Sequence, residues 1–240
     1  SIVNPHAEII FVDPEGERHH WTRVTERLPT KVESIKPHPH GIELGQLQRM
    51  VAESKDLNLN HFLLNNFSGV TNRARKELCQ AAEMEGTRKM KTVKGDDIRA
   101  LLESFQGERL FNGSPVKLLK PPTNCLSPIE EMLIKKGLSK TIDSRFVTTL
   151  TRVPSVTQGN PFQVEVGLIF GGGMAADKPV EILRFANRVP LMYQQGGCLL
   201  TKAIESVDWR QYGLDQPGGK GVPKGPAAIL VHLASTNVQF

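Results

Sequence analysis

"PFQVEVGLIFGGG", residues 161–173, is the clearest indication of the fold in the second half of this 240-residue sequence. Apolar side chains occupy every second position from Phe162 to Phe170, and three glycines follow directly. A period of two is typical of a β-strand, and a glycine run is typical of the turn that ends one. The stretch therefore predicts a strand that stops at the glycines 171–173.

The segments around this strand predict a layered unit. In "SPIEEMLIKKGL" (127–138), Ser127 is suited to cap a helix, Pro128 to occupy its first position and Gly137 to end it. We expect a second strand in "VEILRFANRVPL" (180–191), a helix in "CLLTKAIESVDW" (198–209) and a last strand in "AAILVHLAST" (227–236). The order helix, strand, strand, helix and strand indicates an α/β or α+β unit.

The first half of the sequence has a helical period instead. Apolar residues at helical spacing predict four helices, within residues 42–51, 57–67, 72–84 and 96–105. Linkers rich in Pro and Gly flank them, "RLPTKVESIKPHPHG" (27–41) and "GERLFNGSPVKLLKPPTNC" (107–125). A compact all-helical unit is expected from about residue 40 to residue 106.

The start of the sequence predicts a β-hairpin. "AEIIFVDPEGERHHWTRV" (7–24) alternates, turns at residues 13–16 and resumes with Trp21 and Val24. An isolated hairpin is marginally stable in water. We therefore expect this hairpin to belong to a sheet whose other strands are not in this sequence.

The composition excludes several classes of protein. The sequence is 39% hydrophobic and 23% charged, without an apolar run of about 18 residues or a secretory signal pattern, so we expect a cytoplasmic protein with no membrane partner. Cys79, Cys125 and Cys198 are odd in number and far apart, which favours buried free thiols over disulfides or zinc. No local pattern of nucleophile, base or metal ligands occurs, so we expect no catalytic residue, bound cofactor or metal in this chain.

The charge distribution suggests a candidate surface for an anionic partner. The formal net charge is +5, and "TRKMKTVK" (87–94) carries four cations and no acid. Phosphate contacts and a merely solvated face explain such a pattern equally well. The candidate DNA-binding residues of this basic rim are Arg73, Arg75, Lys76, Arg88, Lys89, Lys91 and Lys94.

A second candidate is "VDWRQYGL" (207–214). Only two Trp and two Tyr occur in 240 residues, yet Trp209 and Tyr212 stand three apart with Arg210 between them. Such a group could stack on a ligand or pair with phosphate, but packing at a helix end is the commoner role of aromatic residues. The pattern alone favours packing.

Five strings carry a resemblance to a known family. They are "KPHPHGIELGQLQRM" (36–50), "GNPFQVEVGLIFGGG" (159–173), "VEILRFANRVPLMYQQGG" (180–197), "ESVDWRQYG" (205–213) and "ILVHLASTNV" (229–238). In this order they resemble the B subunit of DNA topoisomerase VI, the archaeal type IIB enzyme. The resemblance runs over essentially the whole chain.

The resemblance implies an α+β architecture of three parts. Residues 1–30 resemble the last hairpin of an ATPase domain of the gyrase, Hsp90, histidine kinase and MutL type. Residues 40–106 resemble the family's helix-two-turns-helix domain, and 108–240 its transducer domain, truncated and similar to domain 2 of ribosomal protein S5. No complete ATP site or DNA-cleavage site is recognisable, so ATP and magnesium are expected only in the intact subunit.

The resemblance also implies a function and partners. In the family, ATP dimerises the B subunits, and the transducer relays this to the DNA-cleaving A subunit of an A2B2 heterotetramer during passage of double-stranded DNA. Trp209, Arg210 and Tyr212 match a Trp-Lys-x-Tyr motif of the family that is implicated in contacting DNA, with Arg210 in place of the lysine, which keeps the charge. The alternative is a protein-interaction scaffold without DNA contacts. A helical repair-type module is disfavoured, since it would need a nucleophile or base.

Overall fold

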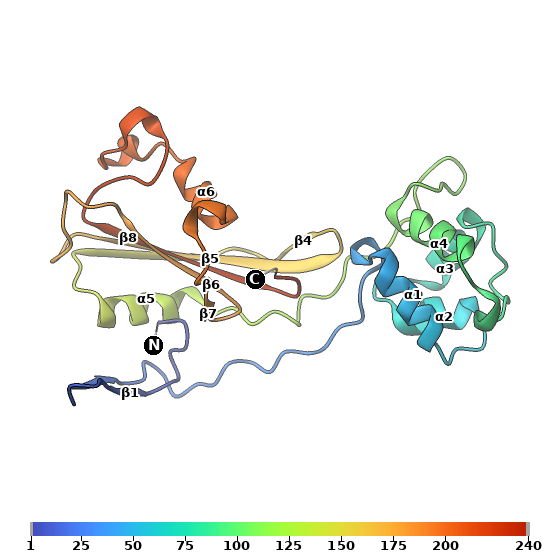
Figure 1. The fold of residues 1–240 in the computed structure, drawn as a ribbon, viewed down its shortest axis with the longest axis horizontal. Helices are drawn as coiled ribbons and strands as arrows, with labels where there is room; N and C mark the ends of the chain where they lie inside the picture. Colours follow the sequence, from blue (N-terminus) through green and yellow to red (C-terminus); the bar gives the residue numbers. More distant parts are fainter. Residues whose placement is uncertain (1, 239–240) are drawn as a thin grey trace. The chain divides into compact units, whose positions relative to one another are not determined.

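The computed structural model describes residues 2–238 and divides into two compact units. One unit contains Ser1–Val32, Leu126–Pro154 and Phe162–Phe240, and the other contains Glu33–Cys125 and Ser155–Pro161. The first is built on a sheet and the second on helices (Figure 1). The expected α+β composition is confirmed, whereas the domain names and the boundaries 1–30, 40–106 and 108–240 stay predictions. No helix of the described residues is long and apolar enough to cross a membrane.

The larger unit is built on a six-stranded mixed sheet, of which residues 155–161 are grouped with the other unit. Its strands are β3 (Phe146–Thr151), β4 (Ser155–Thr157), β5 (Asn160–Phe170), β6 (Glu181–Ala186), β7 (Val189–Pro190) and β8 (Ala227–Ser235), in the order β3-β5-β8-β6-β7 with β4 paired to β5. β8 runs antiparallel to β5 and parallel to β6. The strands expected at the sequence positions of β5 and β8 are confirmed, but the prediction omitted β3 and β4.

The prediction of a single strand over 180–191 is wrong, because two strands, β6 and β7, occupy this stretch. β6 ends at Ala186, and β7 returns antiparallel to it. Asn187 and Arg188 connect them with φ of 46° and 65°. Two consecutive residues with positive φ make the tight turn that suits a two-residue hairpin.

Helix α5 (Glu131–Thr141) also differs from its prediction. Its N-cap is Glu130 rather than Ser127, since the backbone N–H groups of Ile129 and Glu130 bind the Glu165 carboxylate instead of entering the helix. Gly137 lies inside the helix and does not end it. A Cβ at Gly137 would lie 3.2 Å from Cα of Ile2, so close packing explains this glycine.

The two faces of the sheet are covered unequally. Helix α5 lies on one face and α6 (Leu199–Glu205) on the other (Figure 1). Along β5 the residues facing α5 are buried, namely Gln163, Glu165, Gly167 and Ile169. The residues of the α6 face, Val164, Val166 and Leu168, are only half-buried, and Phe170 is 40% exposed. The more polar face of this strand is therefore the better buried one.

The expected hairpin at the start of the chain is confirmed as β1 (Ile9–Val12) and β2 (Arg18–Trp21). Asp13 fixes the turn, because its carboxylate accepts the backbone N–H of Glu17 at 2.7 Å. All four β1 side chains are exposed, by 39–57%. These strands form a two-stranded sheet of their own, in which Phe11 stacks on His19 and the apolar β1 side chains stay about half exposed.

The four expected helices of the second unit are confirmed as α1 (Leu44–Glu53), α2 (Leu59–Asn66), α3 (Asn72–Ala81) and α4 (Asp96–Gln106). The side chains of Asn58 and Thr71 cap α2 and α3, and Gly107 ends α4 with φ of 81°. The core is apolar, and its fully buried members include Leu47, Leu59, Phe62, Leu63, Leu78, Leu101 and Phe105.

His38 joins separate segments of the helical unit. Its Nε2–H donates to the carbonyl of Leu119 at 2.9 Å, and its Nδ1 accepts the backbone N–H of His40 at 3.3 Å. Gly69 and Gly159 both pack on the imidazole ring, and both have positive φ. This histidine therefore has a structural explanation that needs no metal ion.

Candidate nucleic-acid interface

Trp209 and Tyr212 lie in a short 3₁₀ helix, Trp209–Tyr212, that follows α6. The Trp209 indole N–H donates to the carbonyl of Ile204 in α6 at 2.7 Å, and its backbone N–H donates to the Gln216 side chain at 2.9 Å. The two rings meet edge to face with centroids 6.0 Å apart. Trp209 is half-buried whereas Tyr212 is 69% exposed, so Trp209 anchors the corner and Tyr212 projects from it.

Arg210 carries its own counter-ion. Its Nε and Nη2 donate to the two oxygens of Asp208 at 2.8 and 3.0 Å, and the hydrogen bond from Arg210 holds the pKa of that carboxyl below its usual range. The guanidinium also packs closely on Gly219. The pair is exposed, so its contribution to stability is small. A phosphate could replace Asp208 as the partner of Arg210 at little cost.

The aromatic corner forms one side of an apolar groove of about 430 Å³. The groove is lined by Phe146, Leu168, Phe170, Val207, Trp209, Tyr212, Leu214 and Ala227. Half of these residues lie in strands β3, β5 and β8, and the other half in the segment 207–214 that follows α6. The corner is thus both a projection into solvent and a wall of an apolar depression.

The basic segment 87–94 is an ordered turn containing a 3₁₀ helix, Met90–Thr92. Arg88 binds Asp97 of α4 with two hydrogen bonds of 2.8 and 2.7 Å. The same carboxylate accepts the backbone N–H of Lys94 at 3.1 Å. Among the described residues, Lys89, Lys91 and Lys94 are exposed and form no salt bridge.

The three cations of α3 differ from one another. Arg73 pairs with Glu77 at 2.7 Å, one turn further along the helix. Arg75 is half-buried, and its Nε has no partner among the described residues. Lys76 is exposed without a salt bridge in the described part of the chain.

The predicted site residues therefore fall into three groups. Arg88, Lys89, Lys91 and Lys94 share one turn, whereas Arg73, Arg75 and Lys76 lie on α3. The aromatic corner belongs to the sheet unit and the other two groups to the helical unit. Within these groups the lysines and Tyr212 are the side chains free to meet a ligand, and Arg88 and Trp209 have structural partners.

Sequence reasoning missed a buried polar network in the sheet unit. Glu165 and His232 are both fully buried, and Nδ1 of His232 donates to Glu165 at 2.8 Å. Nε2 of the same ring accepts the backbone N–H of Arg188 at 3.0 Å. Burial would raise the pKa of Glu165, but His232, the N–H groups before α5 and Thr151 hold it below its usual range. A lone histidine in the apolar run 227–234 was the available signal.

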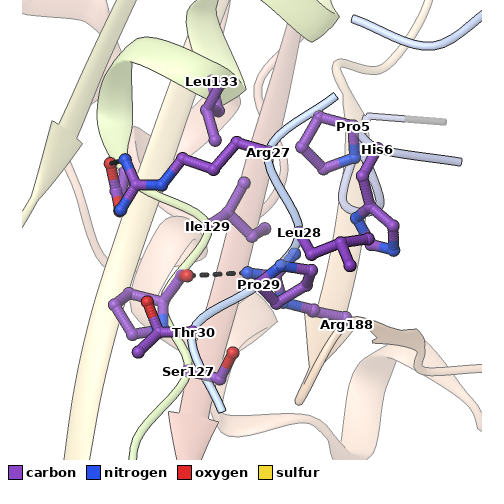
Figure 2. A pocket seen from close by; sticks show the side chains of 12 residues that line it. Pro5, His6, Arg27, Leu28, Pro29, Thr30, Ser127, Ile129, Leu133 and Arg188 are labelled. Carbon is purple, nitrogen blue, oxygen red and sulfur yellow. Dashed lines mark hydrogen bonds and ion pairs between the residues drawn. The ribbon is translucent and has the colours of Figure 1, made fainter. Parts of the chain in front are cut away.

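Arg188 connects this network to the start of the chain. Its guanidinium donates to the carbonyls of Val3 at 3.2 Å and Pro128 at 2.7 Å. Figure 2 shows it beside a cavity of about 40 Å³, with Arg27 and Leu133 on the opposite side. Arg27 crosses to α5 by pairing with Glu130 at 3.0 Å. Residues 2–32 are therefore held to the sheet by polar bonds as well as by packing.

The glycine-rich turn after β5 does not suit a nucleotide phosphate. A Cβ on Gly172 would lie 2.1 Å from the carbonyl oxygen of Asp143, so the turn is packed against its own chain. In the described residues, Asp13, Glu17 and His19 are a group whose ligand atoms lie within 4.8 Å of one another. Asp13 already binds the turn of the β1–β2 hairpin, so this cluster has a structural role.

Comparison with known proteins agrees with this architecture. The family described as "Topoisomerase VI B subunit, transducer" matches residues 121–240. The B subunit of type 2 DNA topoisomerase 6 from Methanococcoides burtonii is 47% identical over the whole chain, which covers 37% of that relative. Relatives of the same name from Archaeoglobus fulgidus and Saccharolobus islandicus are 44% and 31% identical over the whole chain, covering 38% and 43% of their lengths.

The sheet with α5 and α6 on its two faces lies within the stretch that matches the transducer family. The chain belongs to the topoisomerase VI B subunit family. It spans less than half the length of these relatives.

Proposed function

We propose that this chain forms the relay and DNA-contacting part of a topoisomerase VI B subunit. Residues 40–106 would be its helix-two-turns-helix domain and 108–240 its transducer, similar to ribosomal protein S5 domain 2. ATP and magnesium would bind elsewhere in the intact subunit and dimerise it. The transducer would then carry that closure as a rigid-body motion to the A subunit of an A2B2 heterotetramer during duplex passage.

The observation that most supports the proposed DNA contact is the geometry of the aromatic corner, Trp209–Tyr212. Tyr212 is mostly exposed, and Trp209 is held by a hydrogen bond to α6, so the exposed ring has a rigid support. Arg210 lies next to it with a planar guanidinium suited to phosphate. An exposed aromatic ring offers a face on which a base can stack, and the neighbouring cation can pair with a phosphate. Lys89, Lys91 and Lys94 support a second, sequence-independent contact in the helical unit.

The relay is supported by the bonds of Arg188. This residue holds the segment before the β1–β2 hairpin, the start of α5 and, through its N–H, the His232–Glu165 pair. Three segments distant in sequence thus meet at one residue. A displacement of the segment before the hairpin would therefore act on the turn between β6 and β7 and on the start of α5.

Fluorescence anisotropy of a labelled duplex of about 60 base pairs, titrated at low and moderate salt, tests the DNA contact. We expect salt-sensitive binding that weakens in Tyr212→Ala and in Lys89→Ala/Lys91→Ala. The lysine variant should also reduce the salt slope by about 1 to 2, because each lost phosphate contact removes roughly one released counter-ion. Tyr212 is preferable to Trp209 as a target, since Trp209 supports the fold.

The matched control is Lys135→Ala/Lys136→Ala on α5, which removes the same charge from exposed positions. Equal weakening by both lysine pairs would show a nonspecific charge effect and contradict the assigned surface. Absence of binding at low salt would favour the alternative, a protein-interaction scaffold. In that case the exposed apolar side chains of β1 and the groove beside Tyr212 would be protein contacts.

The relay itself is tested in an assembled A2B2 enzyme that contains this sequence. Arg188→Gln should leave ATP hydrolysis in place while it lowers ATP-dependent relaxation of supercoiled DNA. Equal loss of both activities would point to a folding defect rather than to lost coupling. Unchanged relaxation would remove Arg188 from the relay.

A further inference from the structure

Cys198 lies in a polar environment that is unusual for a buried thiol. It immediately precedes α6 and is only 2% exposed. The hydroxyl of Tyr193 donates to its sulfur at 3.3 Å. Exposed residues 192–197 form the loop over it. A hydroxyl group that donates to sulfur stabilises the thiolate more than the thiol.

The neighbouring Arg184 supplies a buried positive charge. It is 7% exposed, and its Nη2 donates to the carbonyls of Leu191 at 3.1 Å and Tyr193 at 2.7 Å. Its Nη1 is buried without a partner, and no carboxylate pairs with the guanidinium in residues 2–238. A buried guanidinium without an anion is strongly unfavourable. Arg184 also lies over the Tyr193 ring, 5.2 Å from its centroid, and the Tyr193 hydroxyl in turn donates to the thiol of Cys198.

The three cysteines of the chain differ accordingly. Burial raises the pKa of Cys79 to about 11, and burial also raises that of Cys125. Burial would raise the pKa of Cys198 as well, but the hydrogen bond from Tyr193, the backbone N–H of Thr201 and the Arg184 guanidinium outweigh it and bring the pKa to about 7. The thiol with the lowest pKa is therefore the buried Cys198, whereas the most exposed of the three thiols is Cys125.

We propose that Cys198 is a reactive thiolate held by the Tyr193 hydroxyl and stabilised by the positive charge of Arg184, and that it is the residue of this chain that hydrogen peroxide oxidises. The thiolate sulfur attacks one peroxide oxygen and the O–O bond breaks. The sulfur is oxidised to a sulfenic acid, the peroxide is reduced, and the departing hydroxide takes up a proton to become water. This site is independent of the DNA contacts proposed above.

The first measurement uses the unmodified 240-residue chain and hydrogen peroxide. Sulfenic acid is trapped with dimedone at pH 7.5, and the three cysteine peptides are quantified by mass spectrometry over time. We expect Cys198 to be labelled before Cys125, despite its lower exposure. Labelling of Cys125 first would overturn the proposal, because exposure would then govern the reaction.

The second measurement detects ionisation and does not need access to the sulfur. Thiolate absorbance near 240 nm is titrated in the chain and in Cys198→Ser, and the difference isolates Cys198. A midpoint near 7 is expected. A midpoint at the ordinary thiol value of about 8.5 would overturn the thiolate assignment.

Tyr193→Phe tests whether the Tyr193 hydroxyl lowers the pKa of Cys198. The charged and titratable groups that act on Cys198 in the described structure are Tyr193 and Arg184. Loss of the hydroxyl should move the midpoint toward 8.5 and slow the oxidation, with the ring still in place. Arg184→Lys, which keeps the charge, should retain a lowered midpoint. A Tyr193→Phe chain with unchanged midpoint and rate would contradict the proposed arrangement.

Discussion

The side chains on the two faces of β5 are buried by different interactions and to different extents. On the α5 face, the carboxylate of Glu165 is fully buried and accepts hydrogen bonds from Ile129, Glu130, Thr151 and His232. On the α6 face, the side chains are apolar, yet they stay half-buried or exposed beside a groove. A polar group can thus be buried more completely than an apolar one when it forms all of its hydrogen bonds.

The comparison also separates two kinds of interaction. The α5 face depends on a few directional bonds, so its stability is concentrated in single residues. The α6 face depends on partial removal of apolar area from water, which is spread over many residues. Substitutions on the first face should therefore have larger effects than those on the second.

Glu165→Ala is expected to have the largest effect. It leaves four donors without their acceptor, of which those of Ile129 and His232 are buried, and we expect the free energy of unfolding of the sheet unit to fall by about 3–5 kcal/mol. Urea denaturation followed by circular dichroism would measure it. The exposed Glu181→Ala of β6 serves as the control and should be nearly neutral. A loss below about 1 kcal/mol, as for a surface site, would mean that the network contributes little.

Adjacent residues of β5 provide the next test. Ile169 is fully buried against α5, whereas Phe170 on the other face is 40% exposed. We expect Ile169→Ala to cost about 2–4 kcal/mol and Phe170→Ala about 1 kcal/mol, although Phe is the larger side chain. The same urea titration measures both. An equal or larger effect at Phe170 would show that the α6 face is better covered than its exposure indicates.

The pH dependence of stability gives a smaller, signed effect. The pKa of Glu165 is lowered in the folded state from an ordinary value of 4.5, so the unfolded chain takes up its proton first. This group therefore stabilises the fold above pH 4.5, and that contribution is lost as pH falls through the lower folded value. Glu165→Gln, although less stable overall, should show a flatter stability curve below pH 4.5. Identical slopes would exclude Glu165 as a source of acid sensitivity.

Leu150→Thr is expected to have the smallest effect. Leu150 of β3 pairs with Val166 on the α6 face and is 55% exposed. Threonine keeps a high preference for strands, so we expect a change within about 0.5 kcal/mol. A loss comparable to that of Ile169→Ala in thermal or urea denaturation would reveal a packed interface on this face.

The fold was predictable where a local period was present. The alternation in β5 and the apolar run of β8 identified those strands, and helical spacing identified α1 to α4. Gly137 misled because a glycine that ends a helix and a glycine that admits a neighbouring chain look the same in sequence. Which face of β5 is better buried was not predictable, because it depends on N–H donors about 35 residues earlier in the chain.

The residues of the candidate site could be predicted from the sequence, but not which of their side chains are free to bind a ligand. The sequence indicated Arg88 and Lys89 as equivalent cations, yet Asp97 binds only the first. Likewise, nothing local distinguishes the anchoring Trp209 from the projecting Tyr212. The Arg184–Tyr193–Cys198 group was not expected, since its members come from a strand, a loop and a helix start.

The position of β8 has a kinetic consequence. It lies at the centre of the sheet, between β5 and β6, although it is made last of all the strands. The helices α1 to α4 have mostly local contacts and end at Gln106, so they can fold well before Ser235 leaves the ribosome, on the order of ten seconds later. After β6 has been made and until β8 follows, β5 and β6 lack their common neighbour and expose unpaired edges. A chaperone that binds nascent chains would therefore be expected to act on the sheet unit and to leave the helical unit alone.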